Sequence, residues 1–361
     1  MKKIFLTTIA LLSIVSASVF GMYGVDSGWI NFLTHGNQFR ARLDQLGFTL
    51  GNDTIKGTFG FNNNAGYGGV YGDLLSTANG GITYDFKPSI SMGLGYTSSL
   101  ISVGVGYNAT IGTDYKGGGK SYNPVAHTPV LVLNAMDNAF RMAIPIQVYA
   151  DGNTNAVSVD SQFRYYTGLD MFPEIRLYLR YGSFTTKTGG VTSKEGESFG
   201  FDFRLYFGSM VEEVALKPYV KLVYNGALGK YHDNTRVEAV KVMKKQQSGS
   251  PIIFAKNAWI LNLVAGLGLS ANSDIVSLYL EPSLGLKVNQ AGSADKNAKE
   301  TYGLGYDVYA EIYITPLKNL EWYFEASIGN VGVVNNNNQV VAGKGLGFAG
   351  TTGITWYLPA L

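Results

Sequence analysis

The feature that most constrains the fold is a strict alternation of apolar and polar side chains between Ser198 and Gly208. Successive side chains of a β-strand point to opposite faces, so a period of two predicts a strand. Its apolar face carries Phe199, Phe201, Phe203, Leu205 and Phe207, and its other face carries Gly200, Asp202, Arg204 and Tyr206. A strand with a large aromatic face and a charged face is typical of an outer-membrane β-barrel, with lipid outside and water inside.

The same pattern recurs along the whole chain. In the second half we expect strands over 173–184, 198–208, 215–225, 257–270, 275–289, 301–315, 320–330 and 344–358. In the first half the expected strands are 38–50, 55–61, 81–86, 89–97, 100–111, 128–134, 140–150 and 156–167. Whether Lys87-Pro88 is a tight turn or a kink within one strand stays open. Since single-chain bacterial barrels have even strand numbers, the sequence predicts 14 or 16 strands.

The connections between the predicted strands alternate in length. Short ones lie near 168–173, 209–214, 271–274 and 315–319, and long ones near 184–197, 226–256, 290–300 and 331–343. Short periplasmic turns and long extracellular loops distinguish outer-membrane barrels. The predicted fold class is therefore all-β, a transmembrane antiparallel up-and-down barrel of about 14–16 strands.

The N-terminus has the composition of a secretory signal peptide. Met1-Lys2-Lys3 is followed by an apolar stretch and then by small residues up to Gly21, so we expect a signal peptide over 1–21. Residues 22–37 form an N-terminal segment in which Asp26 to Gly36 allows one short helix, capped by Asp26 or Ser27. A turn tucked under the barrel, a functional plug and an interfacial anchor all remain open for it. The barrel itself is assigned to 38–361.

Composition and motifs exclude several classes of function. The chain is poor in charge, at 15%, where ~25% is typical of globular domains, and it holds 24 Tyr, 19 Phe and 46 Gly. A net charge of +2 and the absence of Cys argue against a nucleic-acid footprint and a disulfide framework. The G-x-G-x-x-G match at 345–350 is followed by too little chain for a dinucleotide site. We find no metal-ligand spacing and no nucleophile motif, and expect neither a cofactor nor an enzyme.

Charged side chains on the faces opposite the apolar ones are the candidate functional residues. A charge at the lipid midplane costs ~2–4 kcal/mol for Arg or Lys, so these side chains are expected to face the lumen. The predicted lumen-facing charges are Arg164, Glu174, Arg176, Arg180, Asp202, Arg204, Lys221, Glu281, Asp307, Glu311 and Glu325. A structural network of ion pairs and an ion-conducting pore are both consistent with them. We expect Asp202 and Arg204 to pair with neighbours such as Arg176 or Lys221.

The N-terminal sequence also carries a family resemblance. Residues 1–24, then W-I-N-F-L-T-H-G-N-Q-F-R-A-R-L-D-Q-L-G-F from Trp29, and D-T-I-K-G-T-F-G-F from Asp53 resemble the variable surface protein (Vsp) family of intestinal spirochaetes. The match covers residues 1–61, and the mass of 39.0 kDa suits that family. The resemblance implies an abundant, antigenic, surface-exposed outer-membrane protein, one of several variants. It brings no catalytic or cofactor residues to this chain.

The leading function is therefore a variable surface antigen of the outer membrane that can double as a diffusion channel. Three alternatives stay open: a dedicated porin or transporter, an adhesin that binds host matrix through loops 226–256 or 331–343, and a soluble secreted all-β protein. Expected partners are outer-membrane lipid, host antibodies or host matrix, and copies of the same or related surface proteins in a homo- or hetero-oligomer. Nucleic acid is not among them.

Overall fold

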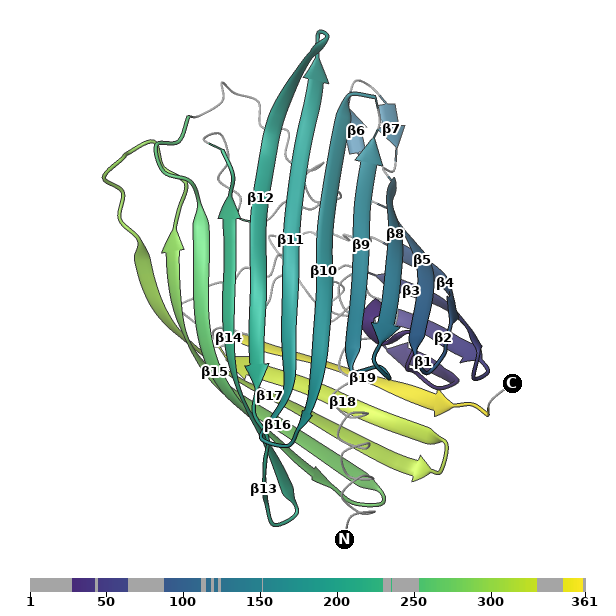
Figure 1. Cartoon of the computed structure of the whole chain (residues 1–361). Helices are drawn as coiled ribbons and strands as arrows, with labels where there is room; N and C mark the ends of the chain where they lie inside the picture. Colours follow the sequence, from purple (N-terminus) through teal and green to yellow (C-terminus); the bar gives the residue numbers. More distant parts are fainter. Residues whose placement is uncertain are drawn as a thin grey trace, which may run out of the picture.

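The chain forms a closed β-barrel in the computed structural model (Figure 1). The structure describes residues 28–42, 45–63, 88–111, 115–117, 120–122, 125–150, 152–229, 235, 253–329 and 347–359. Seventeen strands form one sheet, which closes because β1 pairs with both β2 and β19. Strands β12 and β13 lie one after the other along β14, so the wall has sixteen strand positions. The predicted antiparallel barrel is confirmed, and sixteen is the larger of the two predicted strand numbers.

The wall follows the chain order, with every strand antiparallel to its neighbours. Its strands are β1 (Gln38–Arg42), β2 (Gln45–Gly51), β3 (Ile55–Asn63), β4 (Pro88–Tyr96), β5 (Ile101–Ile111), β8 (Val125–Ala135), β9 (Phe140–Ala150), β10 (Thr154–Leu169), β11 (Phe172–Thr188), β12 (Val191–Tyr206), β13 (Ser209–Val211), β14 (Val214–Ala227), β15 (Trp259–Asn272), β16 (Val276–Gln290), β17 (Thr301–Leu317), β18 (Leu320–Gly329) and β19 (Gly347–Tyr357). The short pair β6 (Tyr115–Gly117) and β7 (Lys120–Tyr122) forms a separate hairpin in the connection between β5 and β8.

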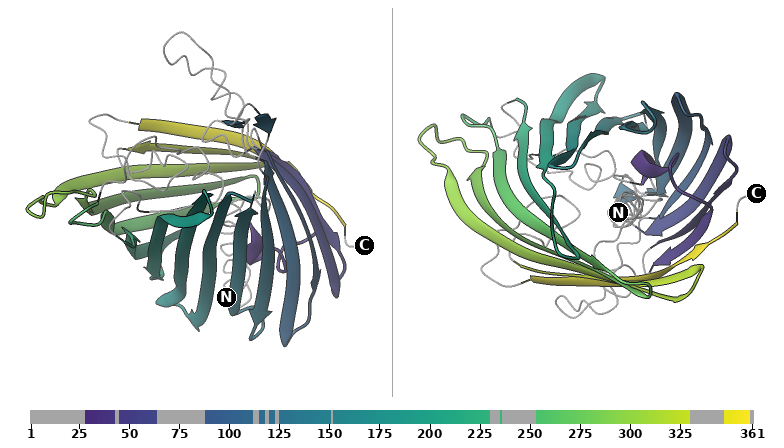
Figure 2. Two further views of the ribbon diagram at one scale, coloured as in Figure 1. Left: turned by 90° about the horizontal axis from the view of Figure 1, so that it is seen from above. Right: turned by 60° about the horizontal axis from the view of Figure 1, so that its bottom comes forward.

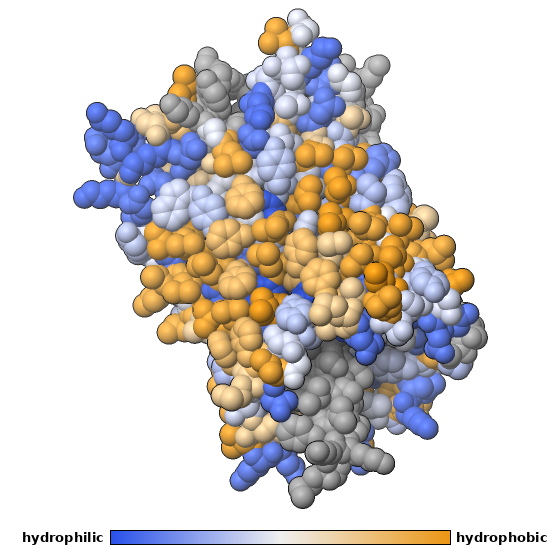
Figure 3. Space-filling view, in the orientation of Figure 1, coloured by the Kyte–Doolittle hydropathy of each residue, from blue (hydrophilic) through white to orange (hydrophobic). Residues whose placement is uncertain are grey.

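Period-two patterning separates the two faces of the wall. The outer face exposes apolar and aromatic side chains along almost every strand, and Figure 3 shows them as a band with polar residues above and below. Outward aromatic residues include Tyr96, Phe199, Phe203, Tyr302, Trp322 and Trp356, each at least 37% exposed. In water an apolar band of this extent would be a severe liability, whereas lipid is its natural environment.

The two ends of the barrel differ in their connections. The turn end holds the connections 52–54, 97–100, 136–139, 170–171, 212–213, 273–275 and 318–319, together with the start of β1 and the end of β19. The loop end holds the other connections, which include 228–258, 291–300 and 330–346. Where the predicted short turns can be compared with the structure, they all fall at the turn end. This sidedness matches the turns and loops of outer-membrane barrels.

Two details of the strand assignment differ from the prediction. The predicted single strand 38–50 is two strands, β1 and β2, which pair with each other. The predicted loop 184–197 is instead an extension of β11 and β12, joined by Gly189–Gly190 with φ of +60° and +84°. Positive φ at both central residues gives the tight turn that suits a two-residue hairpin. The predicted strand 81–86 and the signal peptide lie outside the described residues.

The predicted helix at 26–36 is reduced to one 3-10 turn, η1 (Trp29–Asn31). Its N-cap is Gly28 rather than Asp26 or Ser27, and no side chain caps it. Among the described residues, no helix has the length and apolar character required to cross a membrane.

Candidate functional site

The inner face of the barrel gathers the charged side chains. All eleven predicted charges stand on faces opposite the exposed apolar side chains. Seven of them lie on β10 to β14, namely Arg164, Glu174, Arg176, Arg180, Asp202, Arg204 and Lys221. The other four, Glu281, Asp307, Glu311 and Glu325, lie on β16 to β18. The charges therefore form two separate regions of the wall, one mostly basic and one acidic.

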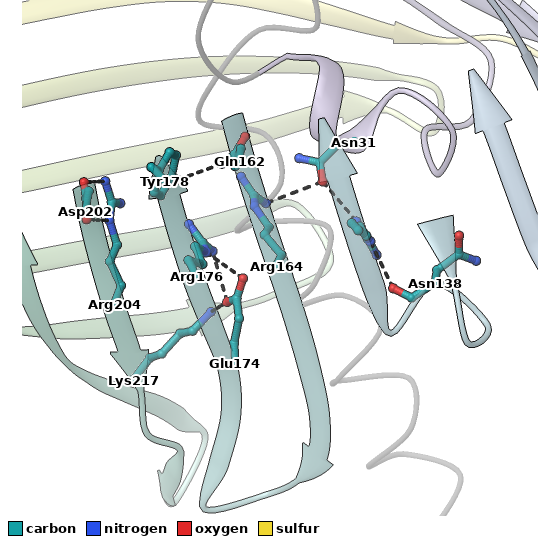
Figure 4. A network of polar contacts seen from close by, with 11 residues as sticks. Asn31, Asn138, Gln162, Arg164, Glu174, Arg176, Tyr178, Asp202, Arg204 and Lys217 are labelled. Atoms are coloured by element: carbon teal, nitrogen blue, oxygen red, sulfur yellow. Dashed lines mark hydrogen bonds and ion pairs between the residues drawn. The ribbon is translucent and has the colours of Figure 1, made fainter. Parts of the chain in front are cut away.

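We call the first region the basic wall (Figure 4). It consists of Arg141, Arg164, Arg176, Arg180, Arg204, Lys217 and Lys221 with the carboxylates Asp160, Glu174 and Asp202. Glu174, only 1% exposed, accepts hydrogen bonds from Arg176 Nε at 2.6 Å and from Lys217 Nζ at 3.0 Å. Asp202 accepts two from Arg204, at 2.9 and 2.7 Å, and Arg180 donates to Asp160 at 3.1 Å. Such bidentate carboxylate–guanidinium contacts hold both partners in a fixed geometry.

The predicted partners of Asp202 and Arg204 are correct in part. Lys221 Nζ lies 3.7 Å from Asp202 Oδ2, as expected. Arg176 instead binds Glu174, its own neighbour two positions back on the strand. Asp202 and Arg204, also two positions apart on one strand face, bind each other. Of the five ion pairs in the described basic wall, these two are within a strand, whereas Lys221–Asp202, Lys217–Glu174 and Arg180–Asp160 join different strands.

We call the second region the acidic wall, made of Glu281, Asp307, Glu311 and Glu325. Tyrosine hydroxyls satisfy two of these carboxylates. Glu311 accepts hydrogen bonds from Tyr309 at 2.5 Å and from Tyr313 at 2.8 Å, and Glu281 accepts them from Tyr219 at 2.8 Å and from Tyr279. Glu325 stands directly opposite Glu311 and pairs with Arg42 of β1 at 3.5 Å. Hydroxyl donors and an arginine thus compensate carboxylates that are largely removed from water.

A third region of the inner face holds the N-terminal segment, residues 28–37. Trp29, Ile30, Phe32 and Leu33 are at most 3% exposed and cluster with Val130, Val132 and Ala143 of β8 and β9. In Figure 2 the segment lies inside the ring of strands. Its large side chains fit over inward-facing glycines, because a Cβ at Gly95 would stand 2.3 Å from Leu33 and one at Gly106 would stand 2.4 Å from Trp29. The segment is thus seated on a hollow in the wall that glycine makes possible.

Polar contacts join the N-terminal segment to the basic wall. Arg141 Nη1 donates to Asn31 Oδ1 at 3.0 Å and to Thr34 Oγ1 at 3.2 Å, and Arg164 Nη1 lies 3.5 Å from the same Asn31 oxygen. On the other side, Lys56 of β3 donates to the carbonyl of His35 at 2.7 Å. These contacts hold a segment with little regular structure of its own in one place on the wall.

The surroundings of His35 predict that the seating of this segment depends on pH. Burial, followed by the positive charges of Arg40, Arg141, Lys56 and Arg164, lowers its pKa to about 3. Gln38 Nε2 lies 2.6 Å from its Nδ1, an arrangement that suits a neutral ring accepting a hydrogen bond. A released segment would regain the ordinary pKa of about 6.5 and bind a proton below it, so seating is favoured above pH 6.5 and weakens down to about pH 3.

We therefore expect Trp29 to become more accessible to acrylamide as pH falls from 7 to 4. The measurement needs Trp259, Trp322 and Trp356 replaced by Phe, since these are the other tryptophans of the chain. A His35→Gln variant should show no such rise, because its side chain does not titrate. Equal pH dependence in both proteins would show that His35 is not the group responsible.

Several inner-face residues were missed by the sequence prediction. They are Arg40, Arg42, Arg141 and Asp160. Lys217 and most of the tyrosines that contact the charges were expected on the polar strand faces but were not named as candidates. The signal was present for Asp160, which has the same parity as Arg164 in its strand, and for Lys217, which has the same parity as Lys221. Arg40 and Arg42 were hidden because β1 was merged with β2. Strand periodicity could not predict that the N-terminal segment packs on the inner wall, because this segment is not a strand.

Metal-ligating side chains do not cluster in the described residues. These residues contain no group of three or more His, Asp or Glu side chains arranged to hold a metal ion. At the turn end, a cavity of about 350 Å³ lies between the N-terminal segment and the turns, lined in part by Asp53, Lys56, Ser98 and Asn138. It is a wide, open depression rather than an enclosed pocket. The charged side chains of the inner barrel face are therefore the candidate functional site.

One family profile and several solved structures are similar to this chain. The profile of the family described as Serpulina hyodysenteriae variable surface protein matches residues 2–357. No curated protein matches the chain. A bacterial polysaccharide outer membrane secretin is similar in structure, with a TM-score of 0.46, 8% identity, and coverage of 90% of this chain and 97% of the other. The outer membrane channel DcaP of Acinetobacter baumannii gives a TM-score of 0.36, 8% identity, and coverage of 88% and 93%. The translocator domain of NalP from Neisseria meningitidis gives 0.33, 13% identity, and coverage of 90% and 89%.

Proposed function

This chain belongs to the Serpulina hyodysenteriae variable surface protein family, and from that premise we propose that its outer-membrane barrel is a surface antigen whose lumen also conducts small hydrophilic solutes. The observation that carries the channel proposal is the charged inner face. Barrels of eight strands fill with side chains, whereas sixteen- to eighteen-stranded porins leave an aqueous channel. The wall here has sixteen positions, and its inner side chains include charged groups that remain partly exposed.

Planar-bilayer recording tests the channel directly. The mature chain, refolded in detergent and added to a lipid bilayer in KCl, should give reproducible single-channel steps. A matched sample refolded without detergent, which cannot close a barrel, should give none. If folded protein, recognised by heat-modifiable migration in electrophoresis, inserts into bilayers and gives no steps, the lumen does not conduct and the channel proposal is wrong.

The surface role depends on the loop end. There β11 and β12 extend beyond the other strands as a polar hairpin, seen at the top of Figure 1. Beside it, the connection after β14 joins the connection after β16 through a β-bridge between Lys256 and Ser293. The described parts of these two connections are thus joined to each other at the loop end. We propose that antibodies recognise the loop end, and that it also offers the contacts for host matrix or for related surface proteins.

Single-cysteine labelling on intact cells tests that orientation, because the native chain contains no Cys. A Thr192→Cys variant places the thiol on the exposed β11–β12 hairpin, and Glu213→Cys places it on the exposed turn at the opposite end. We expect a membrane-impermeant maleimide to label Thr192→Cys on intact cells and Glu213→Cys only after permeabilisation. The reverse result would invert the orientation and remove the hairpin from the cell surface.

A further inference from the structure

The basic wall contains a continuous row of cations across five strands. In the sheet register, Arg141 of β9 stands opposite Arg164 of β10, and Arg164 stands opposite Arg176 of β11. Arg176 in turn stands opposite Arg204 of β12, and Arg204 stands opposite Lys221 of β14. Like charges directly opposite each other destabilise a sheet, so a row of five is a costly arrangement for a purely structural wall.

Carboxylates compensate this row only in part. Below the extended β11–β12 hairpin, the described basic wall has seven cations and three carboxylates, which leaves an excess of four positive charges. Glu174 and Asp202 each contact two cations, and Asp160 contacts Arg180. Arg164 is only 4% exposed, and its Nε has no hydrogen-bond partner. The wall therefore keeps a net positive field.

The cations are held in position by tyrosine rings as well as by carboxylates. The guanidinium of Arg204 lies 4.8 Å from the centre of the Tyr178 ring. Arg176 and Lys217 lie 4.7 Å from the Tyr206 ring centre. Cation–π contacts of this kind favour a fixed placement of the charge. The positive charge is thus built into the wall instead of being carried on freely moving side chains.

The charges that remain accessible differ between the two walls. The side chains of Arg204, Lys217 and Lys221 are 21%, 27% and 30% exposed. By contrast, Glu311 is 1% exposed with both oxygens bound by tyrosine hydroxyls, and Glu325 is 8% exposed and faces Arg42. A solute in the lumen thus meets accessible cations on the basic wall. On the acidic wall Glu311 and Glu325 are turned away from water, and Glu281 and Asp307 are half-buried, Glu281 with both oxygens bound by tyrosine hydroxyls.

We propose that the basic wall makes the lumen selective for small anions, with Lys217, Lys221 and Arg204 as the groups that the anions contact. The inference rests on the proposed channel and names its substrate class. Rings of Arg and Lys side chains favour anions in pores by the same electrostatic attraction. Because salt screens charges over ~10 Å at 0.1 M but ~3 Å at 1 M, the preference should be strongest in dilute salt.

The test is the reversal potential of the refolded protein under a KCl gradient. We expect the sign that indicates chloride permeating faster than potassium, and a smaller potential when both solutions are more concentrated. A Lys217→Gln/Lys221→Gln double variant should shift the potential toward potassium. The matched control, Lys194→Gln, removes a lysine from the exposed loop-end hairpin and should leave the potential unchanged.

The outcomes separate this inference from the channel proposal. Conductance with a reversal potential of zero, or with the sign for potassium, would overturn anion selectivity and leave the channel in place. An unchanged potential in the double variant would show that these two lysines do not set the selectivity. Absence of any conductance would overturn both proposals. Inorganic phosphate added to one side should reduce chloride current in the native protein and reduce it less in the double variant.

Discussion

A Gly106→Val variant is expected to lose the N-terminal segment from its place on the wall while the barrel stays closed. A Cβ at position 106 would lie 2.4 Å from the Trp29 ring, and one at Gly93 would lie 2.6 Å from the same ring. The ring therefore lies directly against two strands, β4 and β5, and is only 2% exposed. Each of the four apolar side chains of the segment contributes ~1.5–3 kcal/mol when buried, so their release is a large effect.

The barrel should survive this change because its hydrogen-bond ladder does not include the segment. Closure depends on the pairing of β1 with β2 and β19, and Gly106 keeps its backbone contacts with Gly93 and Val130 whatever its side chain. Val is also a favourable strand residue. The expected variant is thus a folded barrel with a released N-terminal segment. It would show that the barrel wall is stable without that segment.

Acrylamide quenching of Trp29, with the other three tryptophans replaced by Phe, measures the release. Quenching should rise strongly in Gly106→Val, while heat-modifiable migration remains that of the native barrel. Gly303→Val is the matched control: Gly303 also lies on an inner strand face, and a Cβ there would meet nothing within 4 Å. If Gly106→Val leaves quenching at the native level, the glycine hollow is not what seats the segment.

Strand periodicity identified the architecture because lipid imposes it. Wherever a strand crosses the apolar band, its outer positions have to be apolar, and the pattern of β12 from Phe199 to Leu205 is the clearest case. The same reasoning fails above the band. Residues 184–197 were expected to form a loop, and the two faces of this segment do not differ in polarity. Both faces lie in water there, so the strands continue without alternation, and the Gly189–Gly190 pair was the remaining signal.

The merged strand 38–50 failed for a different reason. Inner positions are Gln38, Arg40 and Arg42 on β1 but Gln45 and Thr49 on β2, so the alternation shifts phase by one residue between the two strands. A two-residue connection is too short to stand out by composition, and the shift was the only local sign of it. The predicted sixteen strands counted 38–50 as one strand and included 81–86, which lies outside the described residues.

The sequence could predict which types of side chain face the lumen, but not which partners they contact. Parity placed eleven charges on inner faces, but ion-pair partners depend on register and side-chain reach, which one sequence does not give. Glu174 and Arg176 were both named, yet their pairing within one strand was not. Seating of the N-terminal segment depends on a long-range match between Trp29 and Phe32 and the glycines of β4 and β5. Neither the aromatic residues nor the glycines show this contact in their local sequence.

A Glu174→Gln variant is expected to destabilise the barrel by ~3–5 kcal/mol, the range for breaking a buried ion pair by removal of one partner. Its carboxylate is bound by both Arg176 and Lys217, and it is one of two acids beside the cation row. A neutral amide keeps the shape of the side chain but leaves Arg176, 8% exposed, beside Arg164 and Arg204 without its counter-charge. The midpoint of urea unfolding in detergent, followed by tryptophan fluorescence, measures the effect.

Glu197→Gln provides the control, since Glu197 pairs with Lys194 on the exposed hairpin, where an ion pair contributes about 0–1 kcal/mol. The cause of the loss can be separated by a double-mutant cycle with Lys217→Met. If excess positive charge is what destabilises Glu174→Gln, removing Lys217 in that background should restore part of the loss, although Lys217→Met alone is neutral or harmful. Additive effects of the two substitutions would contradict this. They would mean that the wall tolerates its cations without Glu174, and that the row of five is far less strained than its register implies.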